Sequence, residues 1–142
     1  MALTRNELQV TWSSAASVTL NTANLTWSDA ITFDATDVAG GVVVSADNQG
    51  TPASGDTMEV WAAYTAGDVL GDTGDDYATD EHATYLGTLD TYASNTPGED
   101  PARKAIPLDV ASFKGCKIGV KAPQGATRNI VARVRLQTQR AA

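Results

Sequence analysis

The segment 67–83 holds the densest group of side chains in this sequence that could bind a ligand. It carries six carboxylates: Asp68, Asp72, Asp75, Asp76, Asp80 and Glu81. Carboxylate oxygens on a loop that contains glycine suit Ca²⁺, although their spacing does not match an EF-hand. We predict no bound metal and no cofactor, with Asp72, Asp75, Asp76 and Asp80 as the candidate ligands if a cation does bind. The alternative is a solvated acidic loop, or one that faces a basic partner surface, because carboxylates at this density repel one another.

Two other side chains could serve as catalytic groups. His82 is the only histidine, and no Gly-x-Ser-x-Gly turn or other activated nucleophile accompanies it. Cys116 alternates with Ile118 and Val120, which predicts a buried thiol that acts as a small apolar side chain. The sequence also lacks phosphate-binding glycine motifs and a Cys/His cluster for zinc. We therefore predict that the protein is not an enzyme.

Three tryptophans are the remaining candidates for chemistry, because exposed indoles can stack on sugar rings. Trp12 continues an alternation with Leu8 and Val10, and Trp27 continues one with Ile31 and Phe33. Both patterns predict a place in the core or at a protein interface. Trp61 lies on the opposite face of its strand from Met58, Val60 and Ala62, together with Glu59. It is the one candidate for a sugar platform, and an oligomer interface could use it equally well.

These residues must be positioned by strands. Short apolar runs of period two alternate with clusters of Gly, Asn, Asp, Ser, Thr and Pro, which is typical of strands and turns. The predicted strands are 8–12, 17–20, 30–34, 41–46, 57–64, 84–89, 104–108, 116–121 and 129–137. Eight or nine short antiparallel strands favour an all-β, single-domain β-sandwich of the jelly-roll kind.

Evidence for other kinds of structure is slight. No segment sustains helical apolar spacing over three turns, so at most one short helical turn is expected, near 110–114. The length of 142 residues suits one domain, which we divide into an N-terminal arm or edge strand, 1–12, and a sandwich, 13–142. No apolar run approaches the roughly 20 residues that span a bilayer, so no membrane partner is expected.

The charge is unevenly distributed along the chain. The net charge is −7, yet residues 1–100 sum to −15 and residues 101–142 to +8. An acidic overall balance argues against nucleic acid as a partner. The basic segments either pair beside acidic ones within the fold, or form one side of a module that stacks its basic face on the acidic face of a neighbour.

The overall pattern resembles a known class of structural proteins. The arm 1–12, the short strands rich in Thr, Ala and Val, and the acidic loop followed by His82-Ala-Thr-Tyr-Leu-Gly-Thr-Leu-Asp90 are similar to capsid decoration (cement) proteins of tailed bacteriophages. The resemblance implies a homo-oligomeric virion protein, a dimer or trimer, that binds the outside of an icosahedral capsid and stabilises contacts between major capsid proteins. Such a protein has no catalytic residues.

The contact surfaces expected for this role start with the arm. We predict that Leu3, Leu8, Val10 and Trp12 reach a neighbouring subunit as an added strand or hook, with Trp61 as a further interface residue. The competing function is a carbohydrate-binding or adhesive β-sandwich module of a virion appendage, in which Trp61 would contact the sugar. The two functions differ in whether glycans shift the fluorescence of Trp61.

Overall fold

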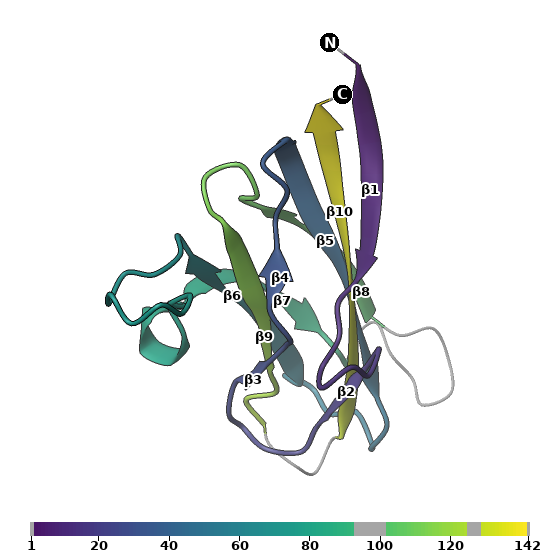
Figure 1. Cartoon of the computed structure of the whole chain (residues 1–142). Coiled ribbons are helices and arrows are strands. Elements are labelled where there is room, and N and C mark those ends of the chain that lie inside the picture. The colour runs from purple at the N-terminus through teal and green to yellow at the C-terminus, as the bar shows by residue number, and fades with distance from the viewer. Residues whose placement is uncertain (1, 93–101, 125–128, 142) are drawn as a thin grey trace.

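The computed structural model describes residues 2–92, 102–124 and 129–141, which form ten strands in two antiparallel sheets packed face to face (Figure 1). This confirms the all-β sandwich that the sequence predicts. No helix in the described part of the chain is long and apolar enough to span a membrane.

The first layer, here called sheet I, is built around the two longest strands. It runs in the order β1-β10-β5-β8, and β2 pairs with the other end of β10. Its strands are β1 (Leu3–Gln9), β2 (Val18–Leu20), β5 (Asp37–Asn48), β8 (Ala102–Leu108) and β10 (Ile130–Ala141). β1 lies along the C-terminal half of β10, with Leu8 opposite Leu136, so the start and the end of the described chain are neighbours.

The second layer, sheet II, runs in the order β3-β9-β6-β7, with β4 also pairing with β9. Its strands are β3 (Thr26–Trp27), β4 (Ile31–Thr32), β6 (Thr57–Thr65), β7 (Thr84–Asp90) and β9 (Gly115–Lys121). A bulge between Val60 and Trp61 shifts the pairing of β6 with β7. The loop between β6 and β7 carries the acidic segment and one 3₁₀ turn, η1 (Asp80–His82).

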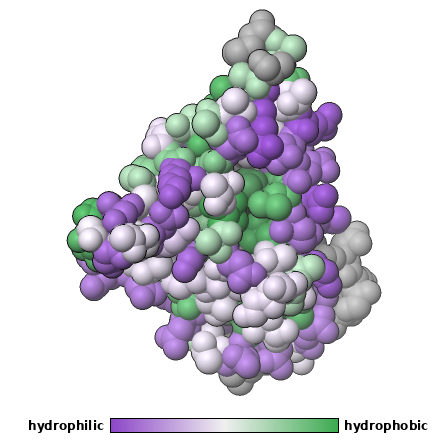
Figure 2. Space-filling model, in the orientation of Figure 1, coloured by the Kyte–Doolittle hydropathy of each residue, from purple (hydrophilic) through white to green (hydrophobic). Residues whose placement is uncertain are grey.

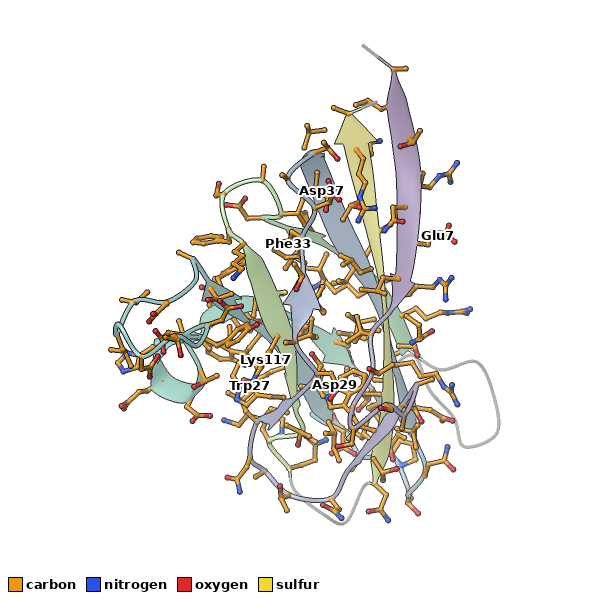
Figure 3. All side chains as sticks on the ribbon, in the orientation of Figure 1. Glu7, Trp27, Asp29, Phe33, Asp37 and Lys117 are labelled. Carbon is orange, nitrogen blue, oxygen red and sulfur yellow. The ribbon has the colours of Figure 1, made fainter. Side chains whose placement is uncertain are left out.

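The core lies between the sheets and follows the period of two. Inward side chains alternate along β10 (Ile130, Ala132, Val134, Leu136), β5 (Val42, Val44, Ala46), β6 (Met58, Val60, Ala62) and β9 (Cys116, Ile118, Val120), and all of them are buried. On the face drawn in Figure 2, apolar residues also gather between the two layers. Phe33, labelled in Figure 3, lies in this region. The remaining surface of that view is mostly polar.

Three local expectations differ from the structure. Two-residue β3 was not expected, because Thr26–Trp27 is too short to show alternation. The first strand begins at Leu3 and ends at Gln9, whereas the alternation placed it at 8–12. Residues 111–114 form bends rather than a helical turn, since the buried Val110 before them fixes the path of that segment.

Candidate functional site

An aromatic row crosses the outer face of sheet II. Trp27 on β3, Gly119 on β9, Trp61 on β6 and Tyr85 on β7 lie directly opposite one another in register. Directly paired residues share one face of a sheet. Neither tryptophan nor Tyr85 belongs to the buried core, and Tyr85 is 51% exposed. The row therefore presents three aromatic rings on the outside of the sandwich.

Trp27 lies flat on the sheet because the residue beneath it has no side chain. A Cβ atom at Gly119 would lie only 2.6, 2.8 and 2.9 Å from Cζ3, Cε3 and Cη2 of the indole. Three neighbouring ring atoms at similar distances mean that one face of the ring rests on Gly119, so its opposite face points away from the sheet. The indole Nε1 donates a hydrogen bond to Oδ1 of Asp80, at 3.1 Å, which fixes the rotation of the ring.

Trp61 and Tyr85 form the other half of the row. Their ring centroids are 5.1 Å apart with an interplanar angle of 67°, which is an edge-to-face pair. Nε1 of Trp61 donates a hydrogen bond to Oε1 of Glu59, at 3.1 Å. The hydroxyl of Tyr85 is hydrogen-bonded to the hydroxyl of Thr88. Each indole N–H is thus held by a carboxylate, and the rings are fixed before any ligand arrives.

Polar side chains border the aromatic row on both sides. Glu59 pairs in register with Lys121 on one side. On the other side, Lys117 Nζ lies 4.7 Å from the centre of the Tyr77 ring, a cation–π contact. Figure 3 shows Trp27 and Lys117 next to one another on the β3–β9 side of the molecule. A flat aromatic surface with hydrogen-bonding groups at its borders can bind a ligand that has apolar faces and polar edges.

The sequence located half of this site. Trp61 and Glu59 lie on the outer face, as the alternation of β6 predicts. Of the two positions expected for Trp27, the core is wrong, because residues 28–30 separate β3 from β4 and break the apparent alternation with Ile31 and Phe33. A place at a protein interface stays a prediction. The missed signal was Gly119, the outward position between Ile118 and Val120, which leaves room for a ring.

The arm residues predicted at an interface divide into two pairs. Val10 and Trp12 are buried in the core of this chain, so their prediction as interface residues is wrong. The core position, the other place expected for Trp12, is confirmed. Leu3 and Leu8 are 47% and 41% exposed. Their contact with a neighbouring subunit stays a prediction.

The acidic loop brings together a different set of carboxylates from the predicted one. Ligand atoms of Asp68, Asp72 and Asp76 lie within 4.8 Å of one another. Asp68 accepts hydrogen bonds from the backbone N–H groups of Gly71, Asp72 and Thr73, and that of Thr73 contributes most to lowering the pKa of its carboxyl. Backbone donors therefore offset much of the repulsion in this loop.

The other two predicted ligands lie apart from this cluster. Asp75 accepts a hydrogen bond from Lys114 Nζ at 2.7 Å, and the same contact raises the pKa of that lysine. Asp80 accepts the hydrogen bond from Trp27. The two carboxylates thus tie the loop to the body of sheet II.

Neither His82 nor Cys116 has the surroundings of a catalytic group. The imidazole of His82 is largely exposed and lies 3.7 Å from Glu81, and it makes no hydrogen bond to a serine, threonine or cysteine of the described residues. Cys116 is buried as predicted, and burial raises the pKa of its thiol to about 12. A thiol of this kind is not a nucleophile at neutral pH.

The outer face of sheet I has a different character. A shallow hollow of about 510 Å³ lies over β5, with small residues on its floor, among them Gly41, Val43 and Ala105, and with Arg135 and Gln137 beside it. No aromatic ring lines this hollow. Between the two outer faces described, only that of sheet II offers rings for stacking.

Comparison with known proteins returned no matching family model and no matching curated protein. Among solved structures, this chain is similar to a mutant of the family 29 carbohydrate-binding module CBM29-2, with 10% identity, a TM-score of 0.45, and coverage of 96% of this chain and 75% of that one. It is also similar to the CBM22-1–GH10 modules of endo-1,4-beta-D-xylanase 10B from Clostridium thermocellum, complexed with xylohexaose. That match has 10% identity, a TM-score of 0.44, and coverage of 98% of this chain and 28% of that one. Both TM-scores lie below 0.5, so neither likeness bears on the function of this chain.

Proposed function

We propose that the protein is a carbohydrate-binding β-sandwich module, which binds a neutral oligosaccharide on the outer face of sheet II. The observation that carries the proposal is the row of Trp27, Trp61 and Tyr85 across neighbouring strands. The C–H groups on one face of a pyranose ring carry partial positive charge, and they pack well on the negative face of an aromatic ring.

The dimensions of the row favour an oligosaccharide over a single sugar. The ring of Trp27 lies over Gly119 on β9, and Tyr85 lies two strands further along, on β7, so the row spans about 10 Å. That span exceeds one pyranose ring. Glu59 and Lys121 border the row with an acceptor and a donor for sugar hydroxyls, and Lys121 has no ion-pair partner among the described residues.

The first test is a titration of tryptophan fluorescence, followed by calorimetry, with a panel of neutral gluco-, xylo- and manno-oligosaccharides. We expect saturable binding to at least one member, and a stronger response to longer oligomers. Trp61→Ala should reduce the affinity by roughly thirtyfold or more, the loss typical of a central aromatic anchor worth about 2 kcal/mol. A folded protein that responds to no member of the panel contradicts the proposal.

Two tyrosines of similar exposure supply a matched control. Tyr85 belongs to the row, whereas Tyr92 follows β7 and lies outside it, with exposures of 51% and 49%. Tyr85→Ala should weaken binding and Tyr92→Ala should leave it unchanged. Equal effects of the two variants would mean that the ligand does not bind along the row.

Binding to a phage capsid stays a prediction with a separate test. Co-sedimentation with intact and emptied phage heads, scored as copies per capsid subunit, distinguishes it from glycan binding. If the wild type binds the shell saturably and responds to no oligosaccharide of the panel, the capsid function replaces carbohydrate binding.

A further inference from the structure

The outer edge of β1 has hydrogen-bonding groups that are directed away from its own sheet. β1 pairs with β10 on one side, and no other described strand lies along its second side (Figure 1). The backbone N–H of Val10 donates to the carbonyl of Val134 directly opposite, at 3.1 Å. Because antiparallel partners alternate between bonded and non-bonded pairs, the even residues of β1 bond to β10. The N–H and C=O groups of Leu3, Arg5, Glu7 and Gln9 therefore point to the free edge.

This edge lacks the features that usually keep a free strand from pairing. Proteins protect edge strands with proline, with bulges or with repulsive charges. Residues 3–9 contain neither proline nor glycine, and β1 pairs with β10 over all seven residues without a register shift. Its only charged side chains are one cation, Arg5, and one anion, Glu7.

We propose that β1 pairs with β1 of a second copy of the chain, antiparallel and about a two-fold axis at Asn6. Arg5 then lies opposite Glu7 of the partner subunit, and Glu7 lies opposite Arg5 of the partner subunit. The strand edge is self-complementary, as a two-fold interface requires. The two copies of sheet I become one continuous sheet.

Neighbouring registers are excluded by charge and by hydrogen bonding. An axis at Arg5 would set the two arginines against each other, and an axis at Glu7 would set the two glutamates against each other, which is unfavourable for directly opposed residues. A two-fold axis that passes between two neighbouring residues would place the free N–H and C=O groups of odd residues opposite even residues. The groups of those even residues already bond to β10. Among the axes from Arg5 to Glu7, the central part of the strand, only the axis at Asn6 satisfies both conditions, and it also pairs all seven residues of β1.

The side chains around the axis support the same register. Arg5 has no ion-pair partner among the described residues, and Glu7 lies 3.5 Å from Arg135 with both side chains more than half exposed. Figure 3 shows Glu7 at the margin of the molecule, outside β1. In the dimer, each Glu7 carboxylate would lie between Arg135 of its own chain and Arg5 of the partner subunit. The exposed Leu8 would be covered by Thr4 of the partner subunit.

Sedimentation equilibrium over a concentration series up to the millimolar range tests the dimer. We expect the wild-type chain to dimerise and Arg5→Glu to stay monomeric, because that substitution sets four carboxylates around the axis. The double substitution Arg5→Glu with Glu7→Arg exchanges the charges, restores every pair across the axis, and should restore the dimer. Circular dichroism checks that each variant is folded.

Amide hydrogen exchange then tests the register. With rising concentration, exchange at the N–H groups of Arg5 and Glu7 should slow, whereas exchange at Asn6 and Leu8, already bonded to β10, should change little. A wild-type chain that is monomeric throughout overturns the proposal, as does a dimer that Arg5→Glu leaves intact. A dimer without concentration-dependent protection at Arg5 and Glu7 places the interface elsewhere and also overturns it.

Discussion

A single missing side chain determines the shape of the aromatic row. Gly119 stands in the middle of sheet II, with Trp27 on one side and Trp61 on the other. Its contact with the indole ring of Trp27 leaves no space for a methyl group. The glycine is therefore required by close approach of a ring, and not by an unusual backbone angle.

Gly119→Ala should damage ligand binding more than it damages the fold. The new Cβ would lie 2.6 Å from Cζ3 of Trp27, so the indole must tilt away and can no longer lie flat on the sheet. Overpacking of this kind costs about 1–3 kcal/mol of folding free energy. We expect a folded protein with a lowered thermal midpoint and a clearly weaker affinity in the oligosaccharide titration.

Gly74→Ala is the matched control, because the Cβ there would meet nothing closer than Asp72 Oδ1 at 3.7 Å. Its affinity and thermal midpoint should stay near those of the wild type. Unchanged binding in Gly119→Ala, with Trp27 shown to move, would mean that Trp27 does not contact the ligand.

At the scale of elements, a carboxylate joins the connection between β1 and β2 to the segment between β3 and β4. Asp29 accepts hydrogen bonds from the hydroxyl of Thr11 and from the backbone N–H groups of Ser13 and Ser14, at 2.7 to 3.0 Å. Ser13 and Ser14 have φ angles of 47° and 69°, the left-handed region that non-glycine residues seldom adopt. Asp29 supplies the hydrogen bonds that stabilise this turn.

This contact predicts a loss of stability in acid. The hydrogen bond from Thr11, followed by that from Ser14, lowers the pKa of the Asp29 carboxyl below 3.8. A group with a lowered folded-state pKa stabilises the fold above its unfolded pKa, and this contribution disappears as the pH falls through the folded value. Thermal midpoints measured between about pH 5 and pH 2 should therefore fall with acidification.

Asp29→Ala should lower the thermal midpoint at neutral pH. It should also make the decrease of the midpoint with falling pH smaller than in the wild type. The remainder should persist, because hydrogen bonds also lower the pKa values of Asp34 and Asp68. Glu81→Ala removes a carboxylate that is 87% exposed, and it should change neither property. An Asp29→Ala curve parallel to that of the wild type would contradict the role given to this contact.

The elements also show what the sequence could and could not predict. Long strands with a buried face, such as β10 and β6, repeat apolar residues every second position, and their place in a sandwich follows from that period. β3 has two residues, which is too few for any period, and its partner is more than ninety positions away on β9. Half of the aromatic row depends on this distant pairing, which the local alternation of Trp27 with Ile31 and Phe33 does not reveal.

At the scale of the whole molecule, the uneven charge of the chain is partly compensated within the fold. The basic C-terminal segment contributes Arg140, which contacts Asp37 at 2.7 Å, and Arg135, which contacts Glu7. Lys114 contacts Asp75 of the acidic loop. These contacts join residues far apart in sequence, which a count of charges along the chain does not reveal. They favour the expectation of compensation over that of two oppositely charged faces.

The two proposals together predict how the protein behaves on a glycan-coated surface. A dimer through β1 would carry two aromatic rows, and a second binding event on the same surface is then intramolecular. Wild-type protein should leave a dense glycan surface roughly a hundredfold more slowly than monomeric Arg5→Glu, and the charge-exchanged double variant should be retained like the wild type. Surface plasmon resonance at high and low glycan density measures this difference, which should vanish at low density.

Soluble oligosaccharides separate the two components of that result. Each row binds one soluble ligand, so the wild type and Arg5→Glu should have equal affinities in calorimetry. Equal soluble affinity with equal retention on the dense surface would mean that the two rows cannot reach one surface together, because avidity requires simultaneous engagement. Reduced soluble affinity in Arg5→Glu would instead place the ligand near β1, on the edge of sheet I, and not on the outer face of sheet II.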